Sequence, residues 1–180
     1  MKTERLTLRR FAAADREPFA ALNADPRVMR HFPATLSRAE SDAFVDRIDS
    51  HFAERGFGLW AVERNDTGEF IGFAGLIVPA FEAHFTPCVE IGWRLKAEHW
   101  GQGLAMEGAR AVVDHAFQQL GLNELVALTV PANRRSRRVM EKLGFRRDPA
   151  EDFYHPRLPV GHPLRPHVLY RLAAHWALPE

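Results

Sequence analysis

A short glycine-containing turn between a predicted strand and a predicted helix has the composition of a phosphate-binding loop. It reads WGQGLA over residues 100–105, with Gly101 and Gly103 on either side of Gln102 and small Ala105 after them. Without bulky side chains, the backbone amides can approach a ligand closely. The first amides of a helix lack intrahelical partners and lie at its positive end, so they stabilise an anion. The turn is therefore predicted to hold a pyrophosphate.

The spacing within this turn separates two kinds of pyrophosphate site. A dinucleotide-binding fingerprint needs a third small residue three positions after Gly103, where this chain has Met106. It also needs the first strand of a βαβ unit before it and an acidic residue about 20 positions after it. The turn matches this pattern poorly, which disfavours a dinucleotide site.

The turn and a second block together resemble the GNAT N-acetyltransferases. EIGWRL followed by WGQGLA is similar to the acyl-CoA signature of that family, Gln/Arg-x-x-Gly-x-Gly/Ala, with Trp100 in place of the first residue, then Gly103 and Ala105. With tryptophan at this position, the sequence resembles the ribosomal-protein N-terminal acetyltransferase (Rim-type) branch of the family. This resemblance extends over nearly the whole chain, from ERLTLR to HVLYRL. PANRRSRRVMEKLGF, residues 131–145, resembles the family's Asn-x-x-Ser/Ala helix that ends in Gly-Phe. The two blocks occur in the family's order.

The resemblance implies acetyl-CoA as a co-substrate. It implies that the strand at Glu90–Leu95 splays from the strand at Leu125–Val130 and leaves a cleft for pantetheine. The backbone of Trp93 and Leu95 would pair with this arm. Amides from Trp100 through Gly101, Gln102 and Gly103 to Ala105 would hold the pyrophosphate, and Asn133 and Ser136 complete the donor site. Candidates for a contact with the 3′-phosphate are Lys96 and the arginine run Arg134, Arg135, Arg137 and Arg138. The four arginines are alternatively a solvated helix face.

Acetyl transfer from a thioester to an amine also needs a base for the amine and an acid for the leaving thiolate. Many family members place a tyrosine where this chain has Met140, whose thioether cannot donate a proton. Ser136 resembles the serine of the Rim-type branch near the thioester sulfur; the alternative is a serine on the helix surface. Glu90 is the base candidate because burial would raise its pKa. It is alternatively a carboxylate bonded to a neighbouring strand, and the amine proton can also leave through water. Reserve candidates are Glu63, Glu82 and His84.

Hydrophobic periodicity predicts the elements that position these residues. Ser37 with Glu40 forms a capping-box pattern, Asn133 is a predicted N-cap, and glycines follow the helices. We predict strands over residues 4–10, 59–63, 70–78, 90–95, 124–130, 145–154 and 167–172, and helices over residues 13–24, 37–56, 133–144 and from the glycine turn to residue 120. The predicted fold is a single α/β domain over residues 1–180, a twisted, largely antiparallel mixed sheet with helices on both faces.

Three connections carry no decisive motif and are the candidate acceptor loops, at residues 31–36, 79–87 and 155–167. In the first, His31 and Phe32 either touch substrate or are a surface histidine and a core phenylalanine. The third contains three histidines, but their spacing matches no structural zinc pattern, so we predict no metal.

Composition limits the class of protein further. The chain has 180 residues, a net charge of +1 and 46% hydrophobic residues, which fits one globular domain and disfavours nucleic acid as a partner. We expect no secretory signal and no membrane span, and therefore a cytoplasmic protein. Its single cysteine, Cys88, fits a reducing compartment. Cys88 has no neighbour in sequence that would lower its pKa, so we predict direct transfer without an acetylated cysteine.

These observations predict an acetyl-CoA-dependent N-acetyltransferase. It would move an acetyl group to a primary amine, either a protein N-terminus or a small molecule, in a ternary complex. The missing tyrosine suggests an alternative, a non-catalytic acyl-CoA-binding module or sensor. Binding to nucleic acid or the ribosome through the arginine-rich residues 134–147 is allowed but not required, and a homodimer is plausible on family grounds.

Overall fold

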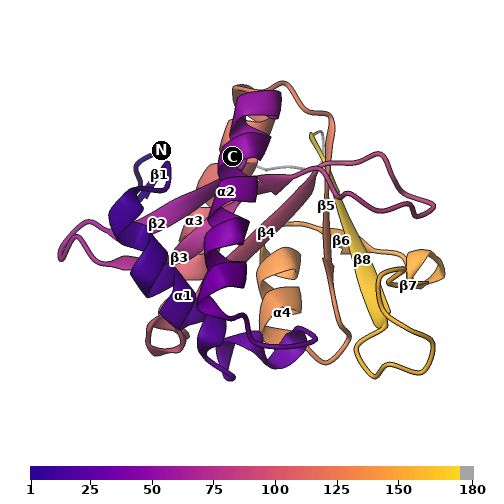
Figure 1. The fold of residues 1–180 in the computed structure, drawn as a ribbon. Coiled ribbons are helices and arrows are strands. Elements are labelled where there is room, and N and C mark those ends of the chain that lie inside the picture. The colour runs from indigo at the N-terminus through magenta and orange to yellow at the C-terminus, as the bar shows by residue number, and fades with distance from the viewer. Residues whose placement is uncertain (175–180) are drawn as a thin grey trace. The chain divides into compact units, whose positions relative to one another are not determined.

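The computed structural model describes residues 1–174, which form two compact units. The first unit comprises Met1–Ile77 and Gly92–Val112, and the described part of the second comprises Val78–Ile91 and residues 113–174. The chain passes from the first unit to the second after strand β3, Phe70–Ile77, returns within strand β4, Glu90–Leu95, and passes to the second again within helix α3, Leu104–Gln118 (Figure 1 labels these elements). Each unit is described by itself.

The first unit is a sheet with helices. Its strands are β1 (Leu6–Arg9), β2 (Leu59–Arg64), β3 (Phe70–Ile77) and the larger part of β4, in the order β1-β2-β3-β4, and the first two pairings are antiparallel. Its helices are α1 (Arg16–Ala24), α2 (Arg38–Arg55) and the first part of α3, with short 3-10 turns at Ala13–Asp15, Val28–His31 and Ala97–His99.

Helices cover both faces of the sheet in the first unit. Neighbouring residues of a strand point to opposite faces. The Phe73 ring lies 6.0 Å from that of Phe19 in α1 and 6.1 Å from that of Phe44 in α2. On the other face, the methyl group of Ala74 lies 3.8 Å from where a Cβ would stand at Gly108 of α3. This glycine lets α3 pack closely against the sheet.

The second unit contains the start of β4 with β5 (Glu124–Thr129), β6 (Arg146–Arg147), β7 (Phe153–Tyr154), β8 (Pro166–Ala173), helix α4 (Arg134–Lys142) and a 3-10 turn at Pro149–Glu151. β5 pairs in parallel with β4 at Glu90 and Val126, and antiparallel with β8. On one face of β8, the Tyr170 hydroxyl donates a hydrogen bond to Glu141 of α4 at 2.9 Å. On the other face, Leu169 packs into an apolar cluster with Phe85 and Val126.

One predicted strand is wrong in detail. Residues 145–154 do not form one strand but the two-residue strands β6 and β7, each paired antiparallel with β8. Between them the Asp148 side chain accepts a hydrogen bond from the Ala150 N–H at 2.9 Å, and Pro149 opens a 3-10 turn. Asp-Pro therefore interrupts the strand by offering the backbone a local alternative partner.

The predicted helix ends are confirmed. The Ser37 N–H and hydroxyl donate to the Glu40 carboxylate at 2.8 and 2.7 Å, which completes the capping box. Glycines with positive φ follow the helices, at 77° for Gly56, 64° for Gly121 and 91° for Gly144. The α/β fold class is confirmed, and no helix within residues 1–174 is long and apolar enough to cross a membrane. The single-domain boundaries remain a prediction.

Gly72 is expected to be the most sensitive glycine of the first unit. The β2–β3 register shifts between Val62 and Glu63, which leaves a bulge before Gly72, where φ is 144°. A Cβ there would lie 2.1 Å from the Arg94 carbonyl oxygen, a backbone atom. We expect Gly72→Ala to lower the free energy of unfolding in urea by about 2–3 kcal/mol, since strain and overpacking add.

The matched control is Gly56→Ala, also at positive φ but with open space around the new methyl group. It carries the backbone strain alone and should cost about 1–2 kcal/mol. Equal losses in the two variants would show that the close approach of backbone to Gly72 has no energetic weight.

Candidate functional site

The glycine turn in the first unit presents a run of unpaired amides. Gly101 and Gly103 adopt φ values of 78° and 82°, and α3 begins at Leu104. Within residues 1–174, none of the N–H groups of residues 101–106 donates to a backbone oxygen, and the first such bond runs from Glu107 N–H to Gly103 O at 3.0 Å. The turn and the positive end of a 15-residue helix therefore offer consecutive donors to an anion.

The tryptophan that departs from the general family pattern has a structural role. Its indole Nε1–H donates to the Leu95 carbonyl oxygen at 2.9 Å, so Trp100 ties the turn to the end of β4. The Gln102 side chain donates to the Glu98 carbonyl oxygen at 3.0 Å and holds the same turn from the other side. Trp93 and Leu95 both lie on β4, as predicted, half-buried and buried respectively.

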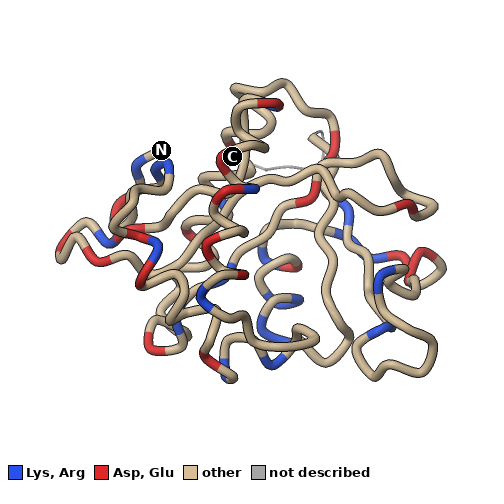
Figure 2. Tube along the Cα trace, in the orientation of Figure 1, with Lys and Arg blue, Asp and Glu red and all other residues tan. Residues whose placement is uncertain are grey.

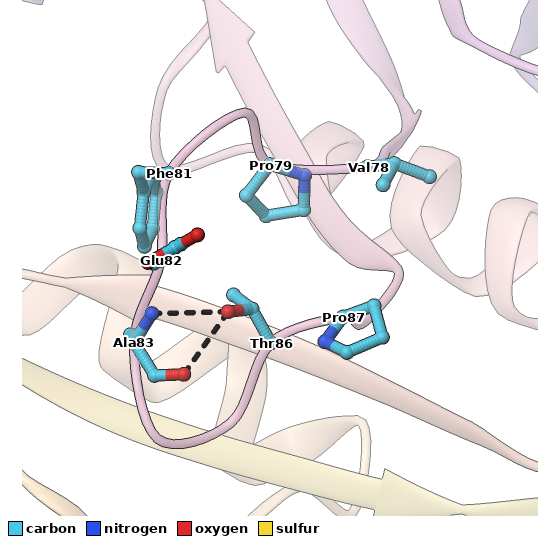
Figure 3. A pocket seen from close by; sticks show the side chains of 7 residues that line it. All are labelled: Val78, Pro79, Phe81, Glu82, Ala83, Thr86 and Pro87. Atoms are coloured by element: carbon cyan, nitrogen blue, oxygen red, sulfur yellow. Dashed lines mark hydrogen bonds between the residues drawn. The ribbon is translucent and has the colours of Figure 1, made fainter.

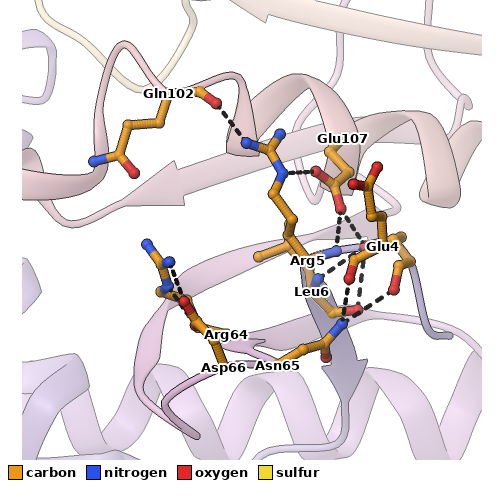
Figure 4. A network of polar contacts seen from close by, with 9 residues as sticks. Glu4, Arg5, Leu6, Arg64, Asn65, Asp66, Gln102 and Glu107 are labelled. Carbon is orange, nitrogen blue, oxygen red and sulfur yellow. Dashed lines mark hydrogen bonds and ion pairs between the residues drawn. The ribbon is translucent and has the colours of Figure 1, made fainter.

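Arg5 is a residue of this site that the sequence interpretation missed. Its guanidinium donates to the Gln102 carbonyl oxygen at 2.9 Å and to the Glu107 carboxylate at 2.7 Å (Figure 4). The Arg5 N–H and the Thr3 hydroxyl donate to the same carboxylate at 2.8 and 2.6 Å. Burial opposes ionisation of Glu107, but these hydrogen bonds lower its pKa. The N-terminal strand segment thus fixes the turn and the start of α3.

We expect Arg5→Ala to weaken acetyl-CoA binding by roughly 5- to 10-fold, which corresponds to about 1–1.4 kcal/mol for losing hydrogen bonds that order the turn. Calorimetric titration measures the change. The control is Arg64→Ala: Arg64 lies in the same view of Figure 4 but pairs with Asp66 at 2.5 Å, in the β2–β3 hairpin. Equal affinity losses in the two variants would contradict a specific role of Arg5.

Glu90 lies in the second unit as a carboxylate without a protein partner. It is half-buried, and within residues 1–174 its oxygens accept no hydrogen bond and form no ion pair, so the alternative of a bond to a neighbouring strand is wrong. Burial raises the pKa of Glu90 to about 8. Burial and the nearby Glu90 charge also raise the pKa of the Cys88 thiol to about 11, which opposes thiolate chemistry at Cys88.

Ser136 and its helix lie in the same unit. The Asn133 side chain accepts a hydrogen bond from the Ser136 N–H at 3.3 Å and donates to the Thr129 hydroxyl at 3.0 Å, so Asn133 is the N-cap of α4. The half-buried Ser136 hydroxyl has no partner within residues 1–174. Met140 is 2% exposed and packs in the core. An apolar, buried side chain therefore occupies the position at which many family members have the tyrosine.

The basic residues are partly engaged elsewhere. Figure 2 shows Lys and Arg along α4. Arg137 donates to the Tyr170 hydroxyl at 3.1 Å and to the Pro131 carbonyl oxygen at 3.2 Å, while Lys96 in the first unit donates to Glu69 at 2.7 Å. Arg134 and Arg138 are exposed. A phosphate contact by all five cations is not supported by these positions.

The reserve bases differ in their surroundings. In the first unit, the Glu63 carboxylate forms an ion pair with Arg9, with 2.8 Å between Oε2 of Glu63 and Nη2 of Arg9. His84 is exposed and lies 4.0 Å from Glu151, and Glu82 is exposed. Glu63 is therefore paired with an arginine, and Glu82 and His84 are exposed to solvent. Among the base candidates, Glu90 is the one whose pKa is raised by burial.

Two of the predicted acceptor loops meet in the second unit. Arg157 in the 155–167 loop donates to the Ala80 carbonyl oxygen at 2.6 Å and lies 5.9 Å from the centre of the Phe81 ring. The 79–87 loop is closed by hydrogen bonds between Ala83 and Thr86 and lines an open cavity of about 480 Å³ with Val78, Pro79, Phe81, Glu82, Ala83, Thr86 and Pro87 (Figure 3).

The 31–36 loop differs from one expectation, and the histidines of the 155–167 loop lie in an aromatic cluster. Phe32 is 39% exposed, so its alternative as a core residue is wrong. The rings of His155 and His167 lie 5.0 Å apart in an aromatic cluster with Phe81 and Phe153, and burial is the main cause of their lowered pKa values. No group of three metal-binding side chains occurs in the described part of the chain.

The site's geometry can be compared with known proteins. Residues 5–146 match the family described as the acetyltransferase (GNAT) domain. The chain belongs to this family. An N-acetyltransferase of uncharacterised function from Bacillus subtilis, YoaA, is 30% identical over 150 residues, which cover 82% of this chain and 83% of YoaA. The FsC-acetyl coenzyme A-N(2)-transacetylase of Aspergillus fumigatus is 34% identical over 151 residues, covering 80% of this chain and 63% of that enzyme.

Solved structures agree on the fold of this acetyltransferase. An acetyltransferase from Agrobacterium tumefaciens has a TM-score of 0.76 and 31% identity, with 96% of this chain and 92% of that chain covered. A spermidine N-acetyltransferase from Vibrio cholerae, solved with CoA and spermine, has a TM-score of 0.76 at 18% identity over 97% of this chain and 98% of that chain, and this likeness concerns the fold alone. The protein is thus an acetyl-transferring enzyme of GNAT fold.

Proposed function

We propose that this protein binds acetyl-CoA and transfers its acetyl group directly to a primary amine in a ternary complex. The run of unpaired amides at residues 101–106 carries the proposal, because consecutive N–H donors at a helix N-terminus suit a pyrophosphate. The names of the relatives support the donor: the Aspergillus enzyme is named for acetyl coenzyme A, and the Vibrio structure holds CoA. In this proposal, the backbone of Trp93 and Leu95 aligns the pantetheine arm.

Two residues of the second unit would move the protons. Glu90 takes a proton from the acceptor ammonium, directly or through water, and the neutral amine attacks the thioester carbonyl. Through its hydroxyl, Ser136 passes to the departing thiolate the proton that the nitrogen of the tetrahedral intermediate releases, so the products are the amide and the CoA thiol and the serine is again neutral. Asn133 fixes Ser136 by capping its helix. A partner-free carboxylate with a raised pKa and a partner-free hydroxyl support these roles.

The acceptor is proposed as a protein N-terminus or a small-molecule amine. The Rim-type resemblance of EIGW and WGQG favours an N-terminus, whereas the Vibrio relative is named for spermidine. A homodimer and a cytoplasmic location remain predictions from the sequence.

The test is thiol release from acetyl-CoA with separate pools of peptide N-termini, aminoglycosides, polyamines and amino acids. Calorimetric titration with acetyl-CoA alone accompanies it, and Gly103→Val, which forces a branched side chain into φ of 82°, is the negative control. We expect binding and thiol release in the wild type and neither in the variant. Absence of acetyl-CoA binding at millimolar concentration would overturn the proposal.

A non-catalytic acyl-CoA sensor is the second candidate, favoured by the apolar Met140 at the position of the usual acid. It predicts that acetyl-CoA raises the melting temperature while every amine pool stays silent. Amine-dependent thiol release that Ser136→Ala reduces would exclude it.

A further inference from the structure

Arg94 of the first unit is a half-buried cation that no carboxylate within residues 1–174 neutralises. Within residues 1–174 it forms no ion pair, and its one hydrogen bond runs from Nη1 to the Asn23 side-chain oxygen at 2.5 Å. Its Nε is buried without any partner. Buried charges are normally paired and hydrogen-bonded, so an unpaired guanidinium needs an explanation. Burial lowers the pKa of Arg94 to about 10, which leaves it charged at neutral pH.

The neighbours of Arg94 hold it in place without using its donors. The Phe32 ring centre lies 4.2 Å from the guanidinium carbon and the Phe73 ring centre 5.3 Å from it. Aromatic rings stabilise the positive charge but accept few of its N–H bonds. Asn23 is fully buried and itself donates to the Ser41 hydroxyl at 2.9 Å. The guanidinium is therefore orientated by its surroundings, not neutralised.

The edge of Arg94 that remains free is the one suited to a carboxylate. Nε and Nη2 lie along one edge of the planar group, and neither has a hydrogen-bond partner in the described chain. This edge makes two parallel bonds to the two oxygens of a carboxylate. Arg94 keeps some exposed surface, and Phe32 beside it is 39% exposed in one of the candidate acceptor loops. Because Nε itself is buried, a small anionic group would have to enter beside Phe32 to reach this edge.

We propose that Arg94 binds a carboxylate of the acceptor, so that the preferred acceptors are amines bearing a carboxylate, such as amino acids, and not polyamines. The inference rests on the proposed N-acetyltransferase function and specifies its substrate class. The carboxylate would complete the guanidinium's hydrogen bonds and offset its charge, whereas a polyamine would add positive charge beside it.

The experiment compares thiol release from acetyl-CoA with standard L-amino acids and with their C-terminal amides, which differ only in the carboxylate, together with spermidine. We expect at least a 10-fold preference in kcat/KM for the acids. Arg94→Lys keeps the charge but loses the planar fork, and should reduce kcat/KM for the acids by 10- to 100-fold, mainly through KM, with little change for the amides. Arg47→Lys is the matched control, because Arg47 also lies over a phenylalanine, 5.3 Å from the Phe44 ring centre, but is exposed.

Amides or spermidine used as well as the acids, or an equal loss with acids and amides in Arg94→Lys, would overturn the inference. If no acceptor causes thiol release from acetyl-CoA, the proposed acetyl transfer is wrong, but that result alone does not decide the carboxylate site. Melting temperatures in the presence of CoA then test the carboxylate site at Arg94 independently of catalysis. N-acetyl-L-amino acids that raise the melting temperature of the wild type but not of Arg94→Lys would uphold the carboxylate site. No rise in either protein would overturn it.

Discussion

Replacing Glu90 by glutamine is expected to lower kcat/KM by roughly 10²- to 10⁴-fold, the usual contribution of a general base. Glutamine keeps the size and polarity of the side chain but cannot take a proton. We expect acetyl-CoA affinity to stay within a factor of about 3, since the amides proposed to bind the donor lie elsewhere in the chain. Steady-state kinetics and calorimetry separate the two effects.

The pH dependence gives this prediction a distinct signature. Burial raises the pKa of Glu90 to about 8, so the base form becomes abundant only as the pH approaches that value. We expect wild-type kcat/KM to rise with pH along a limb with an apparent pKa near 8, and Glu90→Gln to lose this limb. The same limb in the variant would assign it to the acceptor amine and remove Glu90 from the mechanism.

The raised pKa also has a consequence for stability. The folded protein keeps the Glu90 proton up to about pH 8, whereas the unfolded chain releases it near the ordinary value of 4.5. Because the folded state binds more protons in this window, Glu90 makes the protein less stable as the pH rises through it. Glu90→Gln should therefore be more stable than the wild type near pH 8, by at most about 4 kcal/mol, and equal to it below pH 4.5.

Urea unfolding at both ends of the window measures this difference. Glu54→Gln, an exposed glutamate on α2, is the control and should follow the wild type at every pH. If Glu90 is the proposed base, its cost to the stability of the fold is an example of function opposing stability. A stability difference that does not depend on pH would mean that the Glu90 carboxyl titrates normally.

Replacing Ser136 by alanine is expected to lower kcat by roughly 10²-fold or more, because the thiolate would leave without a positioned acid. The Ser136 hydroxyl has no partner in the described chain, so its removal leaves no buried group unsatisfied. The Asn133 cap uses the Ser136 backbone N–H, which alanine retains. We therefore expect the melting temperature and the acetyl-CoA affinity to change little.

Two further variants make the result specific. Ser136→Thr keeps a hydroxyl and should recover part of kcat. Ser50→Ala removes a helix serine whose hydroxyl only donates to the Asp46 carbonyl oxygen at 3.0 Å, and should leave kcat unchanged. Full activity of Ser136→Ala would show that the thiolate takes its proton from water or from another residue.

Features that depend on a few neighbouring residues were predictable from the sequence. The Ser37 capping box, the Asn133 cap, the glycine-ended helices and the glycine turn at residues 100–105 all lie as predicted. Each depends on torsion angles and hydrogen bonds within about one turn of chain, so the residue types themselves specify them. The prediction of one strand over residues 145–154 is wrong, and here too the cause is local. Asp148-Pro149 specifies a 3-10 turn that interrupts the strand.

Features that depend on distant partners were not predictable. Arg5 fixes a turn 97 residues away, and nothing in ERLTLR indicates that contact. Within residues 1–174, the Arg94 guanidinium donates its only hydrogen bond to Asn23, 71 residues earlier, and its aromatic neighbours Phe32 and Phe73 also come from distant segments. The sequence identified Glu90 as a candidate from a resemblance and an expectation of burial, but could not say whether another side chain neutralises it.

The sequence alone therefore determined the family, the fold class and the residues with the right chemistry, because these follow from local patterns and from the order of two motifs. The tertiary structure decided the state of those residues: which amides stay unpaired, which carboxylate is desolvated and which arginine lacks a counter-ion. The physical reason is that a charge responds to everything within several ångströms, and in this chain those neighbours come from segments far apart in sequence.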